Sequence, residues 1–249
     1  MTTPSQIPFQ RNAVQPVECI KGGWNLIKNQ YWLIFVMCLV SGMISSAVPI
    51  ILTAPMMCGL FLTFFKMRRG EPIEFGTLFK GFDHFGQSVI AAFLHAIPIL
   101  VIVVPAYVLF YLFFVLAMIA QGGEEPSAPA MFGVMAMLTL FWLVVLALIM
   151  ILSIGFMFAY PLIVDRGMSG LDAVKLSFKA AMANFWRLLG LVILSFFLNL
   201  GGLLLCFVGV YLMFPIIYSA LAIAYEQVFG LNTSGNVGPD GPPPPPVFT

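Results

Sequence analysis

Charged residues are scarce in this sequence. They make up only 8% of its 249 residues, whereas about 25% is typical of soluble domains. Hydrophobic residues reach 61%, more than a soluble core of this size could hide from water. The composition therefore excludes a soluble globular protein and predicts one membrane domain with short tails. The formal net charge of +1 gives no reason to expect a nucleic-acid partner.

Motifs that carry chemistry are also scarce. The four cysteines are isolated from one another and form no CxxC or Cys/His pattern of the kind that binds metals. Phosphate-binding glycine loops, nucleophile elbows and HExxH patterns are missing from the sequence. We therefore expect no catalytic residue, no metal and no cofactor, and a protein that is not an enzyme.

Long apolar runs are what the sequence has instead. The first, residues 31–65, would form a straight helix of roughly 52 Å, against a hydrocarbon core of roughly 30 Å. Pro49 and Pro55 interrupt this run near its middle, which predicts two antiparallel spans at about 31–47 and 50–66. Both spans are short for a full crossing, so a re-entrant hairpin is the alternative.

Three further apolar runs cover 86–120, 131–164 and about 186–226. The last has candidate breaks at Gly201-Gly202 and Pro215, so it is predicted to form a second hairpin. One span each for 86–120 and 131–164 completes an all-α polytopic membrane bundle of about six transmembrane helices. The two middle spans are long enough that they must tilt, kink or project beyond the lipid.

Three stretches have apolar residues at helical spacing and predict interfacial helices on the cytoplasmic side. They cover about 17–31, 75–85 and 169–187. Ser169, three residues before Asp172, resembles a capping box with Asp in place of the usual Glu or Gln. The apolar positions are Val17, Ile20, Trp24, Ile27 and Tyr31 in the first stretch, Phe75, Leu78, Phe79, Phe82 and Phe85 in the second, and Leu171, Val174, Phe178, Met182 and Phe185 in the third.

One pattern occurs twice along the chain. Glu18, Lys21, Trp24 and Trp32 match Asp172, Lys175, Phe178 and Trp186 at an offset of 154, and Pro55 and Gly70 match Pro215 and Gly230 at an offset of 160. The pattern indicates two parallel hairpin repeats at 17–70 and 171–230, with central helices at 86–164 between them. The membrane domain is then predicted to cover 17–230, and residues 1–16 are predicted to form a flexible polar tail. Residues 231–249, with five consecutive prolines, are predicted to be a disordered tail, and a docking peptide for an aromatic-lined groove is the alternative.

The basic residues predict the orientation, because short loops rich in Lys and Arg stay in the cytoplasm. With six spans, all eleven basic residues fall in cytoplasmic segments, and the loop at 121–130 carries only Glu124 and Glu125. Splitting 86–120 into two spans at Pro105 would place four of the basic residues outside. The six-span arrangement is therefore preferred, with both termini in the cytoplasm.

Two groups of residues are candidates for binding. Side chains suited to anionic lipid headgroups are Lys66, Arg68, Arg69, Lys175 and Lys179, and the alternative is that they only anchor the topology. His95 and Asn199 lie inside predicted spans and form a candidate intramembrane polar site. A proton-responsive gate at His95 competes with plain hydrogen bonding between helices, and packing is the alternative for Asn199.

Short motifs along residues 17–230 resemble a bacterial membrane family. They are Trp24, Asn29-Gln30-Tyr31-Trp32, Pro55, Gly59, Arg69-Gly70 and Leu78-Phe79-Lys80-Gly81-Phe82 in the first half, and Ser177-Phe178-Lys179, Asn184-Phe185-Trp186, Pro215 and Ala224-Tyr225 in the second. They are similar to six-span proteins of the YciC-like kind and to the membrane domain fused to some glycerophosphodiester phosphodiesterases. The resemblance implies a six-helix protein of the bacterial inner membrane without an assigned catalytic residue. The phosphodiesterase is a separate soluble domain, so no hydrolase activity carries over.

Two hypotheses of function follow. The first is a non-enzymatic scaffold or accessory protein that binds membrane lipids or other membrane proteins. The second is a small transporter or permease with a pathway at the interface of the repeats. A polar cavity near His95 or Asn199 would favour transport, whereas a dry, closed core would argue against it.

Overall fold

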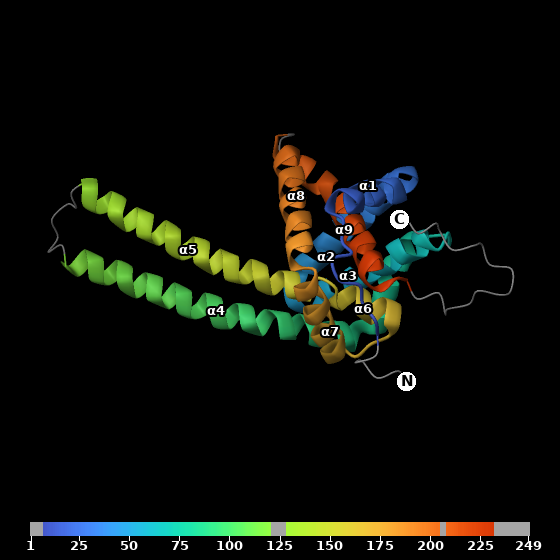
Figure 1. The fold of residues 1–249 in the computed structure, drawn as a ribbon, viewed down its shortest axis with the longest axis horizontal. Helices are drawn as coiled ribbons and strands as arrows, with labels where there is room; N and C mark the ends of the chain where they lie inside the picture. Colours follow the sequence, from blue (N-terminus) through green and yellow to red (C-terminus); the bar gives the residue numbers. More distant parts are fainter. Residues whose placement is uncertain (1–6, 121–127, 205–207, 232–249) are drawn as a thin grey trace.

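The computed structural model describes residues 7–120, 128–204 and 208–231. These residues form α-helices and two 3-10 helices, with no strand among them. Six helical segments are long and apolar enough to cross a membrane. The prediction of an all-α polytopic bundle is therefore confirmed, and the chain is a multi-pass membrane protein. Figure 1 shows two long helices, α4 and α5, extending away from a compact body that the other helices build.

The first hairpin consists of α2 (Tyr31–Ala47) and α3 (Pro49–Arg68). They meet at Val48, whose φ of −140° and ψ of 87° are not helical, because the proline that follows disfavours helical backbone there. The predicted break at Pro55 is wrong, since this residue lies inside α3. With 20 residues, α3 is about 30 Å long, the thickness of the hydrocarbon core.

The second hairpin consists of α8 (Phe185–Leu203) and α9 (Val208–Phe229). α8 ends just after Gly201-Gly202, as predicted, whereas Pro215 lies inside α9 and breaks nothing. A Cβ on Gly202 would lie 2.7 Å from the carbonyl oxygen of Gly209. The close approach of the two helices at this point therefore depends on the absence of a side chain.

The two central runs behave differently from each other. α4 (Phe85–Ala120) is one helix of 36 residues that continues through Pro98 and Pro105. The run predicted as one helix over 131–164 is instead divided into α5 (Ala128–Phe156) and α6 (Ala159–Arg166). Pro161 explains the division, because it has no N–H to donate to the preceding turn. Ser177 compensates by accepting from the Phe158 N–H and donating to the Gly155 carbonyl.

Of the three lead-in segments, α1 (Pro16–Ile27) packs lengthwise on α9. The Gln15 N–H donates to the Gln227 side chain, and the Tyr31 hydroxyl donates to the Leu212 carbonyl, so the two segments run antiparallel. A Cβ on Gly23 would lie 2.7 Å from the Ala220 nitrogen. α1 is therefore held against another helix along one side and continues through η2 (Lys28–Gln30) into α2.

The other two lead-ins are η3 (Phe75–His84), a 3-10 helix, and α7 (Gly170–Ala183). η3 runs back along α3, and α7 packs on α4, α5 and α6. Ser169 caps α7 by accepting from the Asp172 N–H at 3.2 Å, as predicted, but its hydroxyl also donates to the Asp172 carboxylate. The faces buried against protein are rich in small residues, while apolar side chains such as Val17, Phe79 and Leu171 are exposed and available to lipid.

Residues 7–15 are not the flexible tail that the sequence predicts. The Asn184 side chain accepts from the Ala13 N–H and donates to the Gln10 carbonyl, both at 3.0 Å. The Gln10 N–H donates to the carbonyl of Val228 in α9, and Val14 is fully buried. The start of the described chain is thus bound to the end of α9. The proline-rich tail after residue 231 and the loop with Glu124 and Glu125 lie outside the described residues.

Candidate functional site

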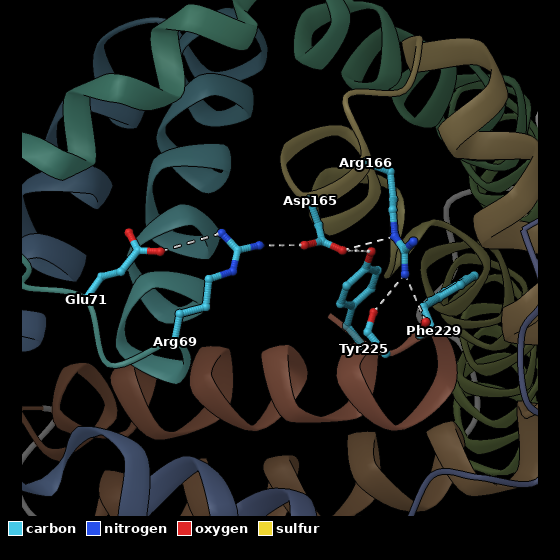
Figure 2. A network of polar contacts seen from close by, with 7 residues as sticks. Arg69, Glu71, Asp165, Arg166, Tyr225 and Phe229 are labelled. Carbon is cyan, nitrogen blue, oxygen red and sulfur yellow. Dashed lines mark hydrogen bonds and ion pairs between the residues drawn. The ribbon is translucent and has the colours of Figure 1, made fainter. Parts of the chain in front are cut away.

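A charged cluster forms where the ends of α3, α6 and α9 meet (Figure 2). Its centre is Asp165, whose side chain is 0% exposed. Arg69 Nη2 donates to Asp165 Oδ1 at 3.0 Å, and the Tyr225 hydroxyl donates to Oδ2 at 2.9 Å. Arg166 Nε lies 3.1 Å from the same Oδ2. An ionised carboxylate is costly to bury unless it is paired and hydrogen-bonded, and these three partners meet that condition.

Arg166 also secures the end of α9. Its Nη2 donates to the carbonyl oxygens of Phe229 and Gly230, both at 3.0 Å. The last carbonyls of a helix have no partner inside it and carry the negative end of the helix dipole. A guanidinium at this place is therefore favourable, and through Asp165 it links α9 to α3.

A second ion pair of the cluster joins α3 and α9. Arg68 Nε and Nη2 donate to the two carboxylate oxygens of Glu226 at 2.6 and 2.9 Å. This two-point geometry is the strong form of an Arg–carboxylate contact. The two side chains are 33% and 20% exposed, so water screens the pair more than it screens Asp165.

The cluster is compensated by its own members, which limits what it does chemically. Its cations face Asp165, Glu226 and Glu71, and among the described residues no group of three His, Cys, Asp or Glu side chains is placed to hold a metal ion. The arrangement is suited to holding three helix ends together.

The structure separates the five predicted headgroup contacts into two sets. Arg68 and Arg69 belong to the cluster, and Lys66 Nζ lies 3.8 Å from a Glu71 carboxylate oxygen. Lys175 and Lys179 lie elsewhere, on α7, where they line a hollow of about 490 Å³. The first set is engaged with carboxylates, whereas the second faces open space.

His95 and Asn199 do not come together as one intramembrane site. The Nε2 atom of His95 in α4 lies 3.5 Å from the Ser153 hydroxyl, and its ring stacks on Phe156 at 4.6 Å between centroids. Asn199 in α8 donates to the carbonyl of Ser195 in its own helix. Neither residue lines the hollow on α7 or a second, apolar hollow on α4 and α5.

Sequence reasoning named Arg68 and Arg69 as candidate headgroup contacts, but it missed their carboxylate partners and Tyr225. Asp165 reads as the polar end of an apolar run, and Tyr225 and Glu226 as the end of a span. The sequence did contain a signal, because Asp165-Arg166, Arg68-Arg69 and Glu226 all lie at span ends that are predicted to be cytoplasmic. Pairing them required the packing of the helices.

Comparisons of the chain with protein-family models, with curated proteins and with solved structures find no match. The likeness to six-span bacterial membrane proteins therefore stays a prediction, and the function has to be argued from the structure.

Proposed function

We propose that this chain is a non-enzymatic scaffold of the bacterial inner membrane that holds other membrane proteins against the arm formed by α4 and α5. The lipid-binding part of this role belongs to the body. Both termini are on the cytoplasmic side in this proposal, because the basic residues and the charged cluster favour that side.

The observation that carries the proposal is the contrast in burial between the arm and the body. In the most apolar 18-residue window of each segment, 6% of the residues are buried in the two segments that form the arm, against 17% in α8, 22% in the segment of α1 and α2, 50% in α9 and 56% in α3. The arm therefore adds little to the protein's own core. A long apolar surface of this kind marks an interaction with lipid or with another protein.

Features of the arm favour a protein over lipid alone. The Trp142 ring of α5 packs against Tyr107 and Phe110 of α4, with centroids 5.0 and 5.8 Å apart. These contacts hold α4 and α5 against each other within the arm. Beside them lies an apolar hollow of about 640 Å³, lined by Phe110, Leu138 and Trp142 among others. Such a hollow fits the side chains of an apolar helix.

Copurification in mild detergent, read by mass spectrometry, tests the proposal. The wild-type chain is compared with Trp142→Ala, which opens the arm, and with Trp186→Ala, which removes a tryptophan that is 79% exposed on α8. We expect one or more membrane proteins to be enriched with the wild type and with Trp186→Ala, and to be lost with Trp142→Ala. Equal recovery with all three chains, or no enriched protein, would refute the scaffold.

A further inference from the structure

A basic hollow lies between the N-terminal segment and α7. Arg11 comes from the segment that Asn184 holds in place, and Lys175 and Lys179 come from successive turns of α7. Asp172 also lines the hollow, but its carboxylate accepts from the Ser169 hydroxyl at 2.7 Å. With three cations and one carboxylate, the lining carries a net charge of +2.

The three cations have no acidic partner in the described part of the chain. No carboxylate of residues 7–120, 128–204 or 208–231 lies within 4 Å of the charged groups of Arg11, Lys175 or Lys179. This sets them apart from Lys66, Arg68 and Arg69, each of which contacts a carboxylate. Cations gathered around open space attract an anion, and Lys and Arg are the side chains that bind phosphate.

The surroundings of the hollow are apolar, which favours an amphiphilic anion. Phe9 and Leu176 line it, and the Lys179 ammonium lies 6.0 Å from the centre of the Phe9 ring. Leu171 and Phe178 are 46% and 39% exposed, and each lies one helical turn from Lys175 on the same side of α7. A helix with lysines beside exposed apolar side chains suits the boundary between headgroups and acyl chains.

We propose that this hollow binds the phosphate-bearing headgroup of an anionic phospholipid. The phosphate lies among Arg11, Lys175 and Lys179, and the acyl chains leave along Leu171 and Phe178. The proposal rests on the membrane location in the proposed function. It does not depend on the arm, so protein copurification through Trp142 and lipid binding at α7 can fail separately.

A lipid titration of the detergent-purified full chain tests this site. Native mass spectrometry gives the apparent Kd for phosphatidylglycerol and for phosphatidylcholine with the same acyl chains. The test variant is Arg11→Gln with Lys175→Gln and Lys179→Gln. The matched control, Lys21→Gln with Lys28→Gln and Lys80→Gln, removes the same charge from exposed positions outside the hollow.

The expected result is preferential binding of phosphatidylglycerol that weakens about fivefold for each charge removed, or roughly 100-fold for the test variant. The control should bind as the wild type does. Equal affinity of the test and control variants, or equal affinity of the wild type for both lipids, would overturn the site. Displacement of the lipid by glycerol phosphate at equal concentration would overturn its lipid source in favour of a soluble phosphate.

Two smaller changes decide the question if the test variant does not fold. Lys175→Gln and Lys179→Gln, made one at a time, should each weaken phosphatidylglycerol binding about fivefold. Lys179→Arg keeps the charge and should retain the affinity. Binding that is unchanged in both single Gln variants would contradict the proposal.

Discussion

Asp165 is the most enclosed charged side chain of the cluster, and its substitution tests what the cluster does. In Asp165→Asn, the guanidinium groups of Arg69 and Arg166 would face a neutral amide instead of a carboxylate. Breaking a buried ion pair on one side costs about 3–5 kcal/mol, so we expect a markedly lower melting temperature. Cys19, Cys38 and Cys58 are free and buried, so a fluorescent maleimide can report unfolding.

The control for this substitution is Asp83→Asn, which makes the same chemical change at an exposed position of η3. The melting temperature of this control should equal that of the wild type. If Asp165→Asn did so as well, the cluster would contribute nothing to holding α3, α6 and α9 together.

At the scale of single elements, the packing of η3 on α3 depends on glycines, of which Gly81 belongs to η3. A Cβ on Gly81 would overlap the carbonyl oxygen of Pro55, whereas a Cβ on Gly76 in the same 3-10 helix would meet nothing within 4 Å. We expect Gly81→Ala to destabilise the protein by about 1–3 kcal/mol, the usual cost of overpacking, and Gly76→Ala to have little effect. The melting temperatures of the two variants are measured with the same maleimide. Equal melting temperatures would show that η3 can move away from α3 at little cost, which would contradict the prediction.

The positions of the helices follow from sequence to a large extent. Pro49 places the first hairpin break correctly, because a proline begins a helix well and constrains the residue before it. Pro55 and Pro215 were predicted to be breaks, but each lies inside a continuous helix. In membrane helices the neighbouring segments and their side chains satisfy the freed backbone groups. The break before Pro161 uses Ser177 of α7, a partner that local sequence does not reveal.

The duplication of the two hairpins stays a prediction, and the structure adds one correspondence between them. Gly59 of α3 and Ser219 of α9 are 160 residues apart. A Cβ on Gly59 would overlap Leu78 of η3, and Ser219 lies against Gly23 of α1. Each second helix of a hairpin is thus covered at the same position by an antiparallel segment, although the two covering segments come from different parts of the chain.

At the scale of the whole molecule, the structure consists of a compact body and an arm that extends from it (Figure 1). The body is closed by contacts distant in sequence, such as Arg68 with Glu226 and Gln10 with Val228. Sequence patterns gave the apolar runs of both parts but not this division, because hydropathy does not distinguish a helix packed in a core from one that projects.

Site-specific photo-crosslinking in intact membranes tests the role of the arm most directly. A photoreactive amino acid replaces Leu140 on the arm, and in the control it replaces Phe196 on α8, side chains that are 64% and 62% exposed. We expect a discrete protein adduct from position 140, and only lipid adducts from position 196. Lipid adducts alone at both positions, or the same protein adduct from both, would contradict a scaffold that acts through α4 and α5.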